Sequence, residues 1–166
     1  MPKQTDNDQF IWALISQTAD IMFLTRDAAV KPFGITAVQA KVLAIIHYHR
    51  GLVTVVELAR RLVRRQNGVS ALITRMMKED LVYEESSSKT HGKKMVGITD
   101  KGLQVYNKIN DLNTISRVLA PLTRAQRERI IRDLMIIRDS AIKELHTNNY
   151  AFIDRITAPT VQEHPA

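Results

Sequence analysis

The 166-residue sequence contains no cysteine, which excludes disulfide bonds and thiol-based redox sensing. Long apolar runs are also missing. The most apolar stretch, Phe10 to Leu24, is interrupted by Ser16 and Asp20. It therefore falls short of the ~20 residues needed to span a bilayer. Asp6 and Asp8 do not fit the basic start of a signal peptide. We therefore expect a soluble, cytoplasmic protein with no membrane partner.

Sequence patterns typical of catalysis and metal binding are missing as well. Residues 68 to 72 resemble half of a nucleophile elbow, but the second glycine and the preceding strand are absent. Glu84 and Glu85 are adjacent in a predicted strand, so they point to opposite faces and cannot flank one bond. His47 and His49 would lie ~200° apart on a helix and could not share one ion. We expect no enzymatic activity, no metal site and no cofactor.

The composition is that of a globular protein with an excess of positive charge. Hydrophobic residues make up 45% of the chain and charged residues 25%, and the length suits one domain with its own core. Lysine and arginine number 24 against 17 acidic residues, which gives a net charge of +7. Basic domains of this size often meet nucleic acid or an anionic membrane, although many meet neither.

Capping boxes and apolar periodicity predict the elements. The pattern S/T-x-x-E/Q at Thr36, Thr54 and Thr123 indicates three helix starts. The predicted helices are 6–30, 36–49, 54–63, one after a corner at 64–68, 99–119, and one from 123. Short β-rich runs at 81–85 and 95–98 predict a hairpin. The predicted domain covers 1–148, with dimerisation helices at about 6–31 and 100–147, a winged helix-turn-helix at about 35–99, and a tail at 149–166.

The helix predicted at 54–63, a tight corner, the helix that follows it and a hairpin form the order of a winged helix-turn-helix, a mainly α fold with a small β wing. In this fold the second helix of the pair enters the major groove of DNA. The predicted outer face of this helix is small or polar and has no acid before Glu79: it comprises Asn67, Gly68, Ser70, Ala71, Thr74 and Arg75. Asn and Arg can pair with base edges, and small residues let the helix approach closely.

Four arginines, Arg60, Arg61, Arg64 and Arg65, stand within six residues just before this helix. Such a run is often only a solvated helix face, but here it adjoins the acid-free face and suggests contact with a polyanion. The sequence thus favours DNA as the partner.

The segments "GITAVQAKVL", "VTVVELARRL", "GVSALITRMMKEDLV" and "VGITDKG" together resemble the MarR family of winged-helix transcriptional regulators, in detail over about residues 35 to 102. Asp80 stands where that family usually has glycine. Thr90, His91 and Gly92 stand where it usually has an Asp-Arg-Arg run in the wing. Lysines keep the wing basic, so phosphate contact is expected there, whereas readout of the minor groove is in doubt.

The resemblance implies a homodimer built by the first and last helices, which would bind a pseudo-palindromic operator. Independently, Phe10, Ile11, Trp12, Leu14 and Ile15 surround their predicted helix with more apolar surface than one monomer face would bury. The expected DNA-binding residues are Arg64, Arg65, Gln66, Asn67, Ser70, Ala71, Thr74, Arg75, Lys89, His91, Lys93 and Lys94.

The resemblance further implies a transcriptional repressor that a small anionic aromatic effector releases from DNA. The candidate effector-binding residues are Trp12, Met22, Phe23, Tyr48 and Met76, although a methionine and aromatic set at helical spacing also fits a plain core. A helical dimeric protein-interaction module with the same fold and no operator remains the alternative, because fold alone does not decide function.

Overall fold

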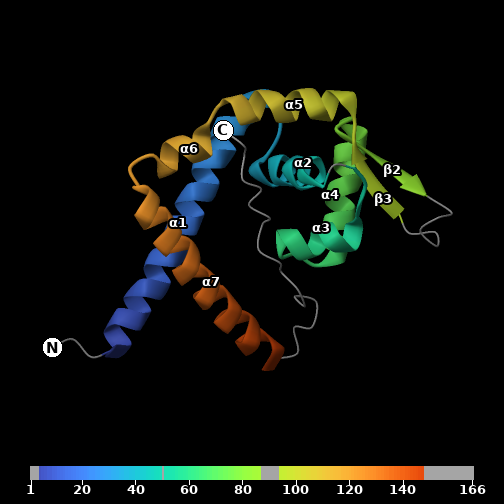
Figure 1. Cartoon of the computed structure of the whole chain (residues 1–166). Helices are drawn as coiled ribbons and strands as arrows, with labels where there is room; N and C mark the ends of the chain where they lie inside the picture. The colour runs from blue at the N-terminus through green and yellow to red at the C-terminus, as the bar shows by residue number, and fades with distance from the viewer. Residues whose placement is uncertain (1–3, 50, 87–93, 148–166) are drawn as a thin grey trace.

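The computed structural model describes residues 4–49, 51–86 and 94–147, with the side chains of 7–145 outside those gaps (Figure 1). Its elements in chain order are α1 (Gln4–Val30), the 3-10 helix η1 (Lys31–Phe33), α2 (Ala37–Tyr48), β1 (Val53–Thr54), α3 (Val55–Leu62), α4 (Gln66–Lys78), β2 (Val82–Ser86), β3 (Lys94–Ile98), α5 (Asp100–Asp111), α6 (Thr114–Leu119) and α7 (Arg124–Thr147). The helices α2, α3 and α4 gather beside the sheet, and α1 and α7 extend away from them (Figure 1). The fold is mostly helical with a small antiparallel sheet, as predicted.

The capping boxes at the starts of α2 and α7 form as the sequence predicts. The Thr36 hydroxyl accepts from the Gln39 amide at 3.3 Å, and the Thr36 amide donates to Gln39 Oε1 at 2.8 Å. Thr123 and Gln126 repeat both bonds at 2.8 and 3.3 Å. At the start of α3 only the Thr54 hydroxyl takes part, accepting from the Glu57 amide at 3.1 Å. Each cap satisfies amides that a helix leaves unpaired at its first turn.

The predicted hairpin is confirmed as β2 and β3, which form one antiparallel sheet with β1 in the order β1-β3-β2. Val82 pairs with Ile98 at the base of the wing, and Val53 of β1 pairs with Val96. Strand β1 is not predicted from the sequence, because a strand of two residues is too short to show alternation. Its pairing ties the segment before α3 to the wing.

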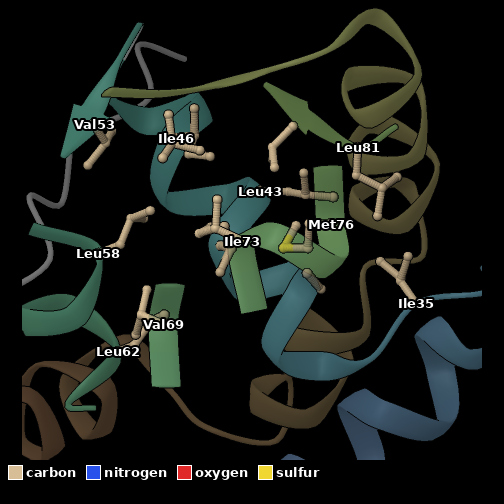
Figure 2. Packing of buried hydrophobic residues seen from close by; sticks show 14 of the residues in the cluster. Ile35, Leu43, Ile46, Val53, Leu58, Leu62, Val69, Ile73, Met76 and Leu81 are labelled. Carbon is tan, nitrogen blue, oxygen red and sulfur yellow. The ribbon is translucent and has the colours of Figure 1, made fainter. Parts of the chain in front are cut away.

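One core holds α4 against α2 and α3. Apolar spacing predicts an inner face of α4 made by Val69, Leu72, Ile73 and Met76. Of these, Val69, Ile73 and Met76 are fully buried, and Leu72 is partly buried against the core. Figure 2 shows the fully buried side chains among Leu43 of α2 and Leu58 of α3. Burial of each large apolar side chain contributes about 1.5–3 kcal/mol, so α4 is firmly seated and its opposite face is set.

Two predicted boundaries are wrong. The helix α4 begins at Gln66 rather than after Gly68, because the corner is completed by Val63, whose φ of 54° lies in the left-handed region. The long helix predicted for 99–119 is broken between α5 and α6 at Asn113, whose φ is 51°. Asparagine tolerates this conformation better than most residues, so a helix can break there without proline or glycine.

The two long terminal helices carry large apolar side chains that nothing in the described part of the chain covers. Phe10 and Trp12 on α1 are 67% and 72% exposed, and Ile136 on α7 is 69% exposed. Within the described residues, no single helix is long and apolar enough to cross a membrane. One pair of helices, Asn7–Phe33 with Ala37–Tyr48, meets the length and composition test together but is bent by 84°.

Candidate nucleic-acid interface

The face of α4 that points away from the core is small, polar and free of acids. Its predicted members are all exposed: Asn67, Gly68, Ser70, Ala71, Thr74 and Arg75. The Thr74 hydroxyl donates to the carbonyl of Ser70 at 3.0 Å. Among the described residues no side-chain acceptor pairs with Asn67, Ser70 or Arg75, so their donors can reach outward. The face can therefore offer an amide and a guanidinium on a smooth helical surface.

The turn between α3 and α4 adds positive charge beside this face. Arg64 and Arg65 are exposed and form no ion pair with any residue that the structure describes. Arg61, in contrast, is paired with Glu57 on the same helix at 2.6 Å. The four-arginine run thus divides. Arg64 and Arg65 carry uncompensated charges at the start of α4, whereas the charge of Arg61 is neutralised within α3.

Lys41 of α2 joins this basic surface, although no sequence pattern pointed to it. Its side chain is exposed, yet partial burial of its amine lowers the pKa of Lys41, and the neighbouring Arg64 guanidinium lowers that pKa further. Two cations that weaken each other's charged form favour an anion between or beside them. Residues so far apart in the chain meet only when α2 packs on α3 and the turn that follows it.

Three hydrogen bonds hold the C-terminal end of α4. The Glu79 carboxylate accepts from Gln39 of α2, which also completes the capping box. The Glu79 carbonyl accepts from Lys101 Nζ at 2.7 Å, and the Asp80 carbonyl accepts from the Thr99 hydroxyl at 2.7 Å. Because α2 and α5 both grip this end, the exposed face of α4 keeps its angle to the rest of the molecule.

Asp80 has a φ of 55°, the left-handed conformation for which glycine is best suited. This explains why the resemblance leads one to expect glycine at this position. Aspartate adopts the conformation at some cost.

The described part of the wing carries one of the predicted basic contacts. Lys94 is exposed, but its Nζ lies 2.9 Å from Glu84 Oε2 of the neighbouring strand. Its charge is therefore partly compensated before any partner arrives. The other predicted wing residues, Lys89, His91 and Lys93, lie outside the described residues, as do Thr90 and Gly92.

Known proteins share part of this sequence and most of this fold. Residues 33–94, which span α2 to the start of β3, match the model of the MarR family. The winged-helix part of this chain is therefore similar to the MarR family. A search of curated proteins finds no match for the sequence. Solved structures, in contrast, match over most of their length.

Three of these structures indicate how far the likeness extends. The MarR family regulator AbsC from Streptomyces coelicolor superposes with a TM-score of 0.77 at 19% identity, over 86% of this chain and 99% of that one. The S. aureus MepR–DNA complex gives 0.71 at 20% identity, over 77% and 94%. The organohalide-sensing regulator RdhR in its 2,4-dichlorophenol-bound form gives 0.71 at 18% identity, over 84% and 86%. At these identities the matches show the shared fold.

The candidate effector residues of this chain lie apart from one another. Met76 is fully buried in the core, whereas Trp12 and Phe23 are exposed on α1 and Tyr48 is exposed at the end of α2. Met22 alone among the five lines a small pocket beside α6. The other lining residues are Thr25, Arg26, Thr114, Ile115 and Val118.

Two polar groups mark this pocket as unusual. The Thr114 hydroxyl is buried and has no hydrogen-bond partner within the part of the chain that the structure describes. Burial lowers the pKa of Arg26, while the nearby Tyr106 raises it, and Arg26 Nη1 donates to the Ile109 carbonyl at 3.4 Å. Burial and a hydrogen bond with Tyr48 raise the pKa of Tyr106 to about 12. These groups connect α1 with α2 and α5.

Proposed function

We propose that this protein is a sequence-specific DNA-binding transcriptional repressor of the MarR family. The observation that carries the proposal is the exposed, acid-free face of α4 beside the unpaired Arg64 and Arg65. A solvated helix face would normally carry acids among its bases. A helix of this kind fits the major groove, and the likeness to MepR, which was solved as a DNA complex, supports that assignment.

In this proposal the polar residues of α4 contact bases and the surrounding basic residues contact phosphates. Arg75 and Asn67 stand on α4 and can each form a pair of hydrogen bonds to a base edge, Arg to guanine and Asn to adenine. Ser70, Ala71, Thr74 and Gln66 supply smaller contacts in the groove. Arg64, Arg65 and Lys41 neutralise phosphates, and the wing lysines at 89, 93 and 94 with His91 contact the backbone further along.

The protein acts as a homodimer in this proposal. Exposed apolar side chains on α1 and α7 exceed what monomeric proteins usually leave to water. They include Phe10, Ile11, Trp12, Leu14, Ile21, Ile130, Ile131, Leu134 and Ile136. A two-fold dimer presents two copies of α4 about one DNA turn apart, so the operator is a pseudo-palindrome. Light scattering on the eluting peak tests this, and a mass of 18.9 kDa would contradict it.

A small anionic aromatic effector releases the DNA in this proposal. RdhR, which shares the fold, was solved with 2,4-dichlorophenol bound. In this chain Met22 and the neighbouring Arg26 pair an apolar surface with a cation, and Trp12, Phe23 and Tyr48 stand exposed where a partner subunit could gather them. Titration of salicylate into the preformed DNA complex tests whether such anions weaken binding.

Selection from random DNA duplexes tests the central claim against a protein-interaction module. We expect the wild-type protein to enrich a palindromic sequence and to protect it from nuclease digestion. The double variant N67A/R75A should enrich no sequence while keeping the thermal stability of the wild type, because both side chains are exposed. A wild-type protein that enriches no sequence would favour the protein-interaction module.

A further inference from the structure

Gly68 occupies a position in α4 for which the protein itself supplies no reason. Glycine is among the poorest helix formers, because it loses the most backbone entropy on folding. Yet Gly68 lies in the first turn of α4 on its exposed face. A Cβ atom added to Gly68 would meet nothing within 4 Å, so packing does not require glycine here.

Other glycines in the chain have clear structural reasons. A Cβ on Gly97 would lie 2.4 Å from the ring of Tyr83, and one on Gly102 would lie 2.0 Å from the Leu81 carbonyl oxygen. Gly34 has a φ of 73°, which side chains disfavour. Among the glycines that the structure describes, only Gly51 resembles Gly68 in having open space and ordinary φ, and Gly51 lies in a bend outside any helix.

The neighbours of Gly68 indicate what the missing side chain allows. Ala71 and Arg75 follow at intervals of three and seven residues, so they share one line along the helix with Gly68. This line has no side chain at Gly68, a methyl at Ala71 and a long cation at Arg75. The helix backbone is therefore most accessible at its first turn, next to Arg64 and Arg65.

We infer that Gly68 is the point where the backbone of α4 comes closest to the DNA, and that its missing side chain sets how deeply α4 enters the major groove. The inference rests on the proposed DNA-binding function. A methyl group at this position extends about 1.5 Å from the backbone. It would hold the helix away from the bases, and Asn67 and Arg75 would then lose the short distances that base hydrogen bonds require.

The test compares G68A with the wild type on two duplexes: the sequence that the wild type selects from random DNA, and a scrambled version of it. We expect G68A to bind the selected duplex about tenfold more weakly, the effect of one impaired base contact. Binding to the scrambled duplex should change less than about twofold, because the phosphate-binding arginines are intact. The melting temperature of G68A should equal or exceed that of the wild type, since alanine is the better helix former.

G51A is the matched control, because it fills equally open space outside α4. It should leave binding to both duplexes unchanged. G68S provides a second small side chain and should weaken selective binding as G68A does. Selective binding by G68A within about twofold of the wild type would overturn the role of Gly68 while leaving the proposed function standing. A wild type that selects no sequence would overturn both.

Discussion

Replacement of Gly102 by alanine should destabilise the protein, because the backbone of another segment occupies the space that the methyl needs. A Cβ at Gly102 would lie 2.0 Å from the carbonyl oxygen of Leu81 and 2.9 Å from its carbonyl carbon. Ordinary van der Waals contact begins at about 3.4 Å, so the two backbones must separate by more than 1 Å. Both contacting atoms of Leu81 belong to the backbone, so no flexible side chain can move to make room.

The structure also indicates what that separation breaks. The Thr99 amide donates to the Leu81 carbonyl at 3.2 Å, and the Thr99 hydroxyl caps α5 by accepting from the Gly102 amide at 2.9 Å. Overpacking costs about 1–3 kcal/mol and a lost cap about 1 kcal/mol. The gain in helix propensity returns about 1 kcal/mol. We therefore expect a net loss of about 1–3 kcal/mol in the free energy of unfolding.

Urea unfolding followed by circular dichroism measures this loss. All proteins must be compared at one concentration, because dimerisation would make the midpoint depend on concentration. The control is G68A, which adds the same methyl to a helix in open space and should not lower the midpoint. A midpoint for G102A equal to or above that of the wild type would show that α5 and the segment between α4 and β2 are not packed as described.

Two further predictions concern DNA binding. Arg75→Ala should cost about 1–3 kcal/mol and relax preference at particular base positions, whereas Arg64→Ala should weaken all sequences about equally; identical specificity profiles from selection would contradict the assignment of α4. Binding should also depend steeply on salt, with a log–log slope of roughly −5 to −9 if six to ten phosphates are neutralised. Arg64→Ala and Lys41→Ala should each reduce that slope by about one, and Arg61→Ala should change it less, because Arg61 is paired with Glu57. Titrations across salt concentrations would refute this division if Arg61→Ala had the largest effect.

Much of the fold could be predicted because its signals are local. The Thr36 and Thr123 caps involve residues three apart, so the sequence displays them directly. The apolar spacing of Val69, Ile73 and Met76 repeats with the helical period, and these residues are buried as that spacing indicates. The left-handed conformations at Val63 and Asn113 could not be predicted, because valine rarely adopts that conformation and asparagine also fits inside a helix, so tertiary packing decides each break.

The candidate site divides in the same way. The exposed face of α4 follows from its helical period once the buried face is known, so its members could be predicted from the sequence. Which arginines remain unpaired could not be predicted, because the sequence does not decide whether Arg61 points outward or pairs with Glu57. In the structure the two side chains are 2.6 Å apart. The effector residues were the least predictable, since Met76 and Trp12 have similar apolar character but opposite burial.

By itself, the sequence determined the order of helices and hairpin, the acid-free face of α4 and the family resemblance, because periodicity, capping and charge act between near neighbours in the chain. Only the tertiary structure decided that Lys41 lies beside Arg64, that Glu79 joins α4 to Gln39, and that Gly68 faces open space while Gly102 does not. These relations depend on how α2, α4 and α5 pack. Packing brings together residues that no spacing in the sequence connects.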